Sequence, residues 1–175
     1  LPSAIDRALE WLDVDPLTGS LLGTSVLAKE GDVVSAGLPP IADVNTGRAT
    51  TAVDAAGNAL WQALLASAAA DDGAVFLNGT LVAREGSPSP VPGRAWEILW
   101  GRPVALGAGG EFALRGNLAG DAADGEMIVR GSGAVVAREG GTLPAIAPWS
   151  LESFGNGTPL FLDASRTLLW FGDWS

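Results

Sequence analysis

The residues of this sequence whose types and spacing best suit metal binding are acidic side chains grouped between apolar runs. Asp13 and Asp15 lie in Asp-Val-Asp-Pro-Leu-Thr-Gly, which has the close oxygen spacing and glycine turn of a calcium loop. The segment lacks the third carboxylate and terminal glutamate of an EF-hand, whereas calcium takes about six to eight oxygen ligands. Asp121 and Asp124 form a second acidic group. Because Asp also makes turns, turn formation is favoured and no cofactor is expected, with calcium at these four residues as the alternative.

Catalysis has few routes open in this sequence. It contains no His and no Cys, so a Ser-His-Asp triad, a His-ligated zinc ion and a thiolate metal site are excluded. Paired carboxylates, as in glycoside hydrolases, remain as a route, but no such pair stands out from its surroundings. We therefore expect no enzyme activity and no catalytic residue, with a carboxylate-dependent, glycoside-active enzyme as the alternative.

Seven tryptophans in a chain without tyrosine are unusual. Trp11, Trp61 and Trp170 follow similar apolar patterns, which predicts that they pack between sheets. Trp100 and Phe154, each followed by glycine, also look equivalent to one another. Exposed tryptophan rings can stack on sugar faces, although packing is the favoured role for most of them. The candidates for ligand binding are Trp96, Trp100, Trp149 and Trp174.

Composition narrows the partners of the chain. Its 20 acidic and 10 basic residues leave a net charge of −10, which argues against binding to nucleic acid or to anionic membranes. No apolar run reaches the roughly 18 residues needed to cross a bilayer, so no membrane insertion is expected. With 47% apolar residues the chain can form a core, and its 24 Gly and 11 Pro are typical of many short strands joined by turns.

A short motif recurs three times at nearly constant spacing. It reads Val-Leu-Ala-Lys-Glu-Gly at 26–31, Leu-Val-Ala-Arg-Glu-Gly at 81–86 and Val-Val-Ala-Arg-Glu-Gly at 135–140. The glutamates Glu30 and Glu85 are 55 residues apart, and Glu139 follows after 54 more. Such a period is the signature of a repeat architecture. We predict one repeat domain over 1–175, with partial units at 1–31 and 141–175 and complete units at 32–86 and 87–140.

Each unit reads as two β-hairpins in series. Asn78-Gly79, between apolar runs at 74–84, is a strong type I′ turn signal, and the segments 126–138 and 20–29 fit the same strand-turn-strand pattern. The preceding hairpins are predicted at 51–61, 104–114 and 160–170. The basic-acidic pair that ends each second hairpin is interpreted as a salt bridge between units or a solvated strand end: Lys29-Glu30, Arg84-Glu85 and Arg138-Glu139.

These units resemble the tandem repeats of uncharacterised bacterial secreted proteins, whose repeats look like β-propeller blades. The resemblance is carried by Asn78-Gly79, by Ala-Arg-Glu-Gly at 83–86 and by its counterpart at 137–140, and it extends from about Gly19 to the end. It implies a propeller-like fold and an extracellular or cell-surface location. The family has no established activity to transfer, so the resemblance implies nothing about chemistry.

The predicted fold is all-β, with about three four-stranded antiparallel units arranged like propeller blades. Closed propellers use about four to eight blades, so the chain is a slice of a longer protein, a subunit of a ring, or a threefold β-trefoil or β-prism. Residues 1–12 are read as strand rather than helix. The hairpin predicted at 21–28 is expected to lie against the C-terminal strands, which include the apolar run 168–171, within one molecule or between two. The predicted function is a non-catalytic extracellular binding, structural or self-assembly module for a protein or glycan surface, with a lectin-like module as the alternative.

Overall fold

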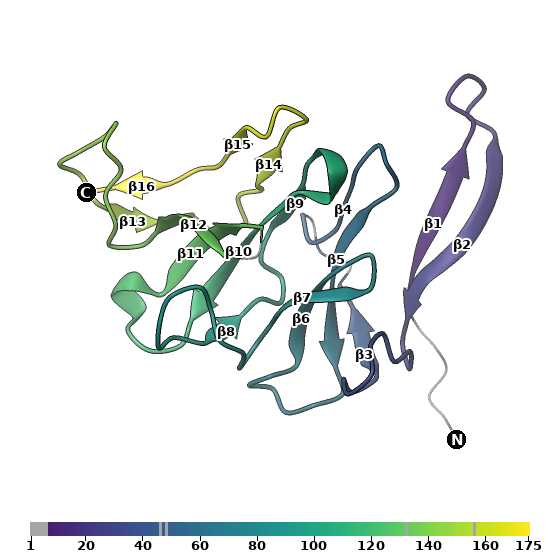
Figure 1. Cartoon of the computed structure of the whole chain (residues 1–175), viewed down its shortest axis with the longest axis horizontal. Coiled ribbons are helices and arrows are strands. Elements are labelled where there is room, and N and C mark those ends of the chain that lie inside the picture. Colours follow the sequence, from purple (N-terminus) through teal and green to yellow (C-terminus); the bar gives the residue numbers. More distant parts are fainter. Residues whose placement is uncertain (1–6, 46, 48, 132, 156) are drawn as a thin grey trace.

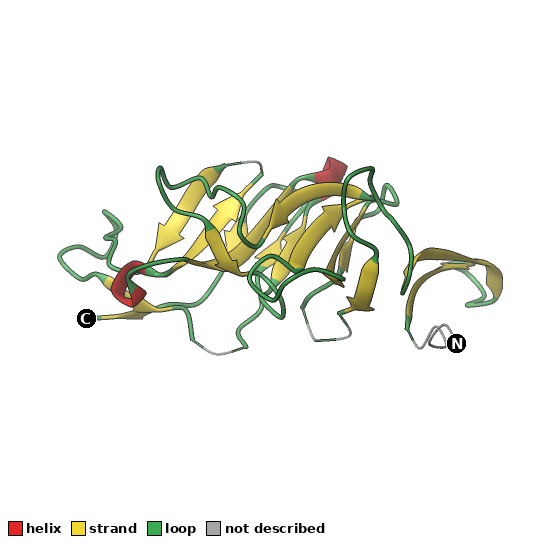
Figure 2. Cartoon of the chain, turned by 90° about the horizontal axis from the view of Figure 1, so that it is seen from below, coloured by secondary structure: helices red, strands yellow, loops and turns green. Residues whose placement is uncertain are grey.

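The computed structural model describes residues 7–45, 47, 49–131, 133–155 and 157–175. Strands hold 46% of the residues and helices 3%, which confirms the all-β prediction. The described strands pair in antiparallel fashion throughout, and no sheet closes on itself. Figure 1 shows the strands as an arc that runs from a hairpin at the N-terminal end to short strands at the C-terminal end. The view turned by 90° places these two ends at opposite sides of the molecule (Figure 2).

Four groups of strands make up this arc. The N-terminal hairpin contains β1 (Ala8–Val14) and β2 (Leu21–Lys29). The first sheet contains β3 (Ile41–Val44), β4 (Ala52–Val53), β5 (Ala59–Leu65), β6 (Gly73–Leu77) and β7 (Thr80–Arg84). The second sheet contains β8 (Trp96–Ile98), β9 (Val104–Leu106), β10 (Phe112–Leu118), β11 (Glu126–Arg130) and β12 (Ala134–Arg138). The C-terminal half-sheet contains the pairs β13 (Leu151–Ser153) with β16 (Asp173–Trp174) and β14 (Phe161–Leu162) with β15 (Leu168–Leu169).

The two sheets share one connectivity. In the first, β3 and β4 lie end to end along β5, which then pairs with β6, and β6 with β7. In the second, β8 and β9 lie in the same way along β10, followed by β11 and β12. The hairpins predicted from sequence are present in both sheets. The short strands β3 and β8 were not predicted, so each unit has five strands rather than four.

Equivalent main-chain hydrogen bonds occur at each junction between groups. Gly31 N–H donates to Ile41 O at 2.8 Å, Gly86 N–H to Trp96 O at 2.8 Å, and Gly140 N–H to Leu151 O at 2.8 Å. These glycines follow the glutamates of the recurring motif and adopt φ of 86°, 76° and 74°, a region that favours glycine. The Glu-Gly spacing in the sequence therefore sets the chain reversal that starts each following group.

Turn chemistry explains why the second hairpin of the first sheet forms where it does. Asn78 and Gly79 have φ of 54° and 95°, as a two-residue type I′ turn requires. The Asn78 side chain also accepts a hydrogen bond from Ala59 N–H at 2.7 Å, which ties the turn to the start of β5. The Asn-Gly signal thus predicted both the place and the type of this turn.

The prediction of a hairpin within residues 20–29 is wrong. These residues form the single strand β2, and its partner is β1, reached through a turn at Asp15. Asp15 accepts hydrogen bonds from Leu17 N–H at 2.8 Å and Thr18 N–H at 3.2 Å. Gly23, the one glycine of this segment, lies within the strand. Residues 8–12 are strand, as preferred, whereas residues 1–6 lie outside the described part of the chain.

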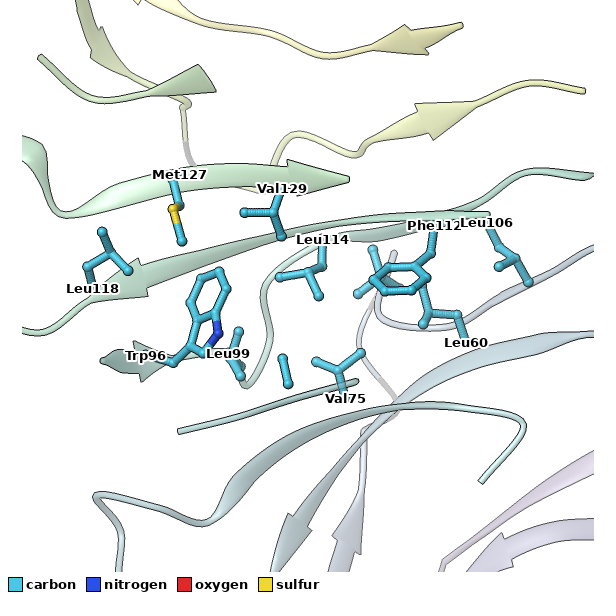
Figure 3. Packing of buried hydrophobic residues seen from close by; sticks show 12 residues of the cluster. Leu60, Val75, Trp96, Leu99, Leu106, Phe112, Leu114, Leu118, Met127 and Val129 are labelled. Carbon is cyan, nitrogen blue, oxygen red and sulfur yellow. The ribbon is translucent and has the colours of Figure 1, made fainter. Parts of the chain in front are cut away.

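Apolar side chains fill the spaces between consecutive groups. Figure 3 shows the cluster between the two sheets, where Val75 and Leu60 of the first face Leu114 and Met127 of the second. A second cluster lies between the hairpin and the first sheet, and a third between the second sheet and the half-sheet. Each complete sheet therefore packs face to face with two neighbours. Its central strands are buried on both faces for that reason.

The strands β4, β9 and β14 meet on the inner side of the arc (Figure 1). Val104 N–H donates to Ala49 O at 2.7 Å, which links the second sheet to the segment that precedes β4. An open cavity of about 270 Å³ is lined by residues of all three segments, including Ala52, Leu106 and Leu162. Corresponding pieces of three successive groups thus surround one space.

Candidate functional site

The N-terminal hairpin is buried on only one of its faces. Leu9, Trp11 and Ala28 pack against the first sheet. The other face is bare, although most of its side chains are apolar. The exposed large hydrophobic residues of the hairpin are Leu12, Val14, Leu21, Leu22 and Val26 on its strands and Leu17 in its turn. A contiguous group of exposed apolar side chains on a folded protein indicates an interaction surface.

The C-terminal half-sheet has the same character at the other end of the arc. Leu151, Phe154 and Leu162 pack toward the second sheet. Leu169 is 65% exposed and Phe171 is 51% exposed on the opposite side. Both residues belong to the apolar run 168–171, which the sequence predicts to be a contact surface.

Each end also presents a strand edge with no strand partner among the described residues. In the first sheet β5 pairs with β6, and in the second β10 pairs with β11. At the C-terminal end β15 and β16 hold the place of β5 but pair only with β14 and β13. In the hairpin β1 pairs only with β2. An open strand edge carries unpaired N–H and C=O groups and readily pairs with another chain.

The expected contact of β2 with the C-terminal strands inside one molecule is contradicted by this arrangement. The hairpin packs on the first sheet, and the half-sheet packs on the second, at the far end of the arc (Figure 1). The described part of the chain is therefore open at both ends. The alternative of contact between two molecules remains a prediction.

Polar side chains clasp the first sheet to the second. The Glu85 carboxylate, which is 4% exposed, accepts hydrogen bonds from Leu99 N–H at 2.6 Å, Trp100 N–H at 3.1 Å and Gly73 N–H at 3.0 Å. Gln62 adds a bond to Arg102 O at 2.6 Å. The glutamate of the recurring motif thus joins two sheets through main-chain N–H groups rather than through a salt bridge.

The basic partner of that motif stays within its own sheet. Arg84 lies 2.9 Å from Asp71, and Arg138 pairs in the same way with Asp124. The interpretation of the Arg-Glu pairs as salt bridges between units is therefore wrong for their arginines. Alternate strand residues point to opposite faces, so the arginine and the glutamate that follows it reach different surroundings.

A buried cluster of charged side chains joins the second sheet to the half-sheet. Arg115, 2% exposed, lies 3.2 Å from Glu126 and donates to Gly155 O at 3.1 Å. Arg102 lies 3.3 Å from the same Glu126 oxygen, and Glu139 accepts from Glu126 N–H at 2.8 Å. Desolvation lowers the pKa of the Arg115 guanidinium and raises the pKa of the Glu139 carboxyl.

This cluster is the strongest place for carboxylate chemistry in the described chain. Glu126 is 7% exposed, and its carboxylate is held between the guanidinium groups of Arg102 and Arg115. General acid catalysis needs a carboxyl group within reach of a substrate oxygen. Both partners of Glu126 instead lock it inside the packed interface, which makes the cluster a crosslink between two groups of strands.

The structure does not bring the four candidate tryptophans together. Trp96 is 4% exposed within the cluster between the two sheets. Trp149 lies exposed on the loop before β13, and Trp100 is half-buried beside Glu85. Trp174 borders a cavity of about 190 Å³ with Arg138 and other residues of β12. These positions do not form one stacking platform for a sugar.

Strand register tests the proposed equivalences between aromatic residues. Trp61 and Trp170 follow the hairpin turns that begin at Asp54 and Asp163, so they hold equivalent places. Trp11 does not share that place, because it lies on β1, which pairs with β2 as β6 does with β7. The Trp100–Phe154 equivalence is displaced by one residue. Leu99, next to β8, is the buried counterpart of Phe154, next to β13.

The four acidic residues of the calcium alternative are split between distant places. Asp13 and Asp15 belong to the hairpin, whereas Asp121 and Asp124 follow β10 (Figure 1). Asp124 pairs with both Arg94 and Arg138, and the hydrogen bond from Arg94 is the leading cause that lowers its pKa. Hydrogen bonds from Leu17 and Thr18 N–H lower the pKa of Asp15. Within the described residues, no three or more acidic side chains are placed to hold a metal ion.

Comparison of the chain with protein-family models, with curated proteins and with solved structures finds no match. In the part of the chain that the structure describes, no helix is long and apolar enough to cross a membrane. The two open ends, each with a bare apolar face and an unpaired strand edge, are the most prominent candidates for a functional surface. They were only partly foreseeable, because exposure of β1 depends on which strand lies beside it.

Proposed function

We propose that this chain is a non-catalytic structural module, built from propeller-like tandem repeats, that associates with other protein chains through its two open strand edges. The secreted repeat proteins that its sequence resembles support an extracellular or cell-surface setting. The single observation that carries the proposal is the contrast between complete and incomplete sheets. Strand β5 is buried on both faces, whereas the apolar strands β1 and β15 each have exposed side chains on one face.

The arrangement of the sheets supports propeller-like blades over a β-trefoil. Consecutive sheets pack face to face, and β4, β9 and β14 surround one inner cavity. A β-trefoil is built around a closed barrel, whereas the sheets described here are open meanders. Radial repetition of such meanders is the design of a propeller.

Catalysis and glycan binding find less support than association with other protein chains does. The buried carboxylates Glu85 and Glu126 are engaged by main-chain N–H groups and by arginines that hold neighbouring sheets together. The candidate tryptophans are dispersed, which weakens the case for a glycan site. Apolar faces left open at two ends of a repeat array, in contrast, are unfavourable in water until a partner covers them.

Hydrogen–deuterium exchange over a protein concentration series tests this proposal. As the concentration rises, we expect slower exchange in residues 8–14 and 168–174, because strand pairing protects edge amides. Light scattering on the same samples should report association. Leu169→Asp should abolish both effects, since Leu169 is 65% exposed and a charge there prevents apolar contact.

Ile98→Asp is the matched control. Ile98 is 39% exposed on β8 in the middle of the arc, and its counterparts in the other groups, Asp43 and Ser153, are already polar. This variant should associate like the unaltered chain. A chain that stays monomeric at every concentration, with unchanged exchange at both edges, would contradict the proposed function.

A further inference from the structure

We propose that two copies of this chain exchange their N-terminal hairpins, so that β1 of each copy pairs with β15 and β16 of the other. The inference rests on the proposed function and names the partner that the two edges fit. Each composite sheet would contain β13–β16 of one copy and β1–β2 of the other. It would then have the same strand order as the first and second sheets.

Strand register identifies β1 as the counterpart of β6 and β11. The three hairpins that end on the recurring motif have a register shift at one common position. The shift falls after Leu9 in β1, after Val75 in β6 and after Ile128 in β11. One edge of β6 pairs with β7 and the other with β5, and β11 pairs in the same way with β12 and β10. The free edge of β1 therefore fits a strand equivalent to β5 or β10.

The segments β15 and β16 together form a strand equivalent to β5 and β10, and its edge is free. The turn before β15 closes with a hydrogen bond from Asp163 N–H to Thr167 O, as Asp54 N–H to Asn58 O does before β5. Trp170 consequently holds the place of Trp61, which pairs with Phe76 in the first sheet. Transferring this register to the two copies gives Leu9 opposite Phe171, Glu10 opposite Trp170 and Trp11 opposite Leu169.

The faces of the two halves match in this register. Leu9 and Trp11 point toward the first sheet of their own copy. Their partners Phe171 and Leu169 are the side chains that point away from the second sheet in theirs. All four would lie on one face of the composite sheet and would be covered together by the first sheet. A shift by one residue would place them on opposite faces.

Charge agrees with the register at the end of the pairing. The same alignment brings Arg7, which already pairs with Asp43 of its own first sheet at 2.6 Å, opposite Asp173. Opposite charges across antiparallel strands are favourable. Glu10 is the exception, because it takes the place held by the buried residues Phe76 and Val129. Its carboxylate is exposed in the single chain and would oppose burial in the composite sheet.

The number of sheets favours two copies. The described residues supply two complete sheets and two halves of a third, so reciprocal exchange between two copies of them would give a ring of six. Closed propellers use about four to eight blades. The arc of one chain leaves its hairpin and its half-sheet at opposite ends (Figure 1).

Disulfide trapping tests the register, and the chain is suited to it because it contains no cysteine. Leu9→Cys combined with Phe171→Cys should yield, on mild oxidation, a covalent dimer of twice 17.7 kDa. Directly opposed residues of antiparallel strands have Cα atoms at about 4.5–5.5 Å, within the range of a disulfide. The control pairs Leu9→Cys with Phe161→Cys, an exposed residue on β14 that lies one strand further away, and should not crosslink.

Three outcomes would overturn hairpin exchange: no crosslink in the Leu9–Phe171 pair, equal crosslinking in the control, or a ladder of species larger than dimers. None of these outcomes affects the hydrogen–deuterium exchange measurements on the unaltered chain. An error about the identity of the partner can therefore be distinguished from an error in the proposed function. Should the cysteine variants not fold, light scattering on the unaltered chain decides, since a mass other than twice 17.7 kDa at saturation contradicts the dimer.

Glu10→Leu provides a gain-of-association test. Glu10 is exposed in the single chain, so the substitution leaves the fold of one copy intact. If Glu10 is buried between copies, its replacement should lower the dimer dissociation constant by about tenfold or more, the equivalent of about 1.4 kcal/mol. An unchanged or weaker dimer would mean that Glu10 does not occupy the place of Phe76.

Discussion

Two equivalent interfaces of this protein are held together by different chemistry. Between the first and second sheets, Gln62 and Glu85 bind main-chain groups of the next sheet. Between the second sheet and the half-sheet, the positions of Gln62 and Gly73 are taken by Arg115 and Glu126, which form a buried ion pair. One backbone arrangement therefore accepts either an amide with a glycine or a guanidinium with a carboxylate.

Space explains why the substitutions occur together. A Cβ atom on Gly73 would lie 2.2 Å from the Glu85 carboxylate, which fills the position where Glu126 carries its side chain. Once a carboxylate is introduced at that place, burial requires a positive partner, and Arg115 supplies it. The difference teaches that neither interface can be altered one residue at a time without leaving a buried polar group unsatisfied.

The largest effect is expected from Arg115→Met. This variant leaves Glu126 buried with one arginine fewer, and breaking a buried pair on one side costs about 3–5 kcal/mol. Urea unfolding measures the loss. The double variant Arg115→Gln with Glu126→Gly copies the first interface and should recover most of the stability. Equal loss in the single and double variants would show that the two interfaces are not interchangeable.

A smaller effect is expected from Gly73→Ala in the first interface. The new methyl group forces the Glu85 carboxylate out of its place, and overpacking of this kind costs about 1–3 kcal/mol. Gly133→Ala is the control, because no atom lies within 4 Å of its added Cβ, and it should change stability by less than about 0.5 kcal/mol. If both variants unfold at the same urea concentration, Glu85 does not require the space beside Gly73.

The smallest effect concerns acid stability and belongs to the first interface alone. The Asn58 side chain, followed by further N–H donors that include Gly110 in the next sheet, lowers the pKa of Asp54 to about 2. A carboxyl group with a lowered folded-state pKa stabilises above its unfolded value near 3.8, and this contribution is lost as the pH falls toward 2. At the corresponding place the second interface has Gly107, which cannot titrate.

Asp54→Asn should therefore remove part of the stability lost between pH 4 and pH 2. The measurement is the unfolding midpoint in urea at several pH values, compared between the variant and the unaltered chain. The difference between the two proteins should shrink as the pH falls. A constant difference across this range would mean that Asp54 stabilises the turn without its charge.

Local signals in the sequence predicted the hairpins well. Asn78-Gly79 predicted a type I′ turn because its two residues adopt positive φ readily. The short strands β3 and β8 went unpredicted, because three or four residues carry too little alternation to be recognised. The segment 20–29 was misread as a hairpin, since a glycine within a strand and a glycine in a turn look alike until the partner strand is known.

The candidate site was predicted less well than the fold. The tryptophans Trp96 and Trp100 were chosen by residue type. The hydrogen bonds that join neighbouring groups of strands depend instead on Glu85, Gln62 and Arg115. A signal was present in the differences between units, because Gln62 and Gly73 change together to Arg115 and Glu126. Only burial on both faces of a sheet gives that joint change its meaning.

The amino-acid sequence by itself determined the all-β class, the repeat spacing and the position of most hairpins, because these depend on turn residues and apolar runs that act over a few neighbours. Tertiary structure decided which faces are covered and which edges stay unpaired. The apolar strands β1 and β5 look alike in sequence, but β5 lies between two sheets while β1 has one neighbour. Burial depends on what lies beside a strand, and that neighbour is chosen by contacts between residues far apart in the chain.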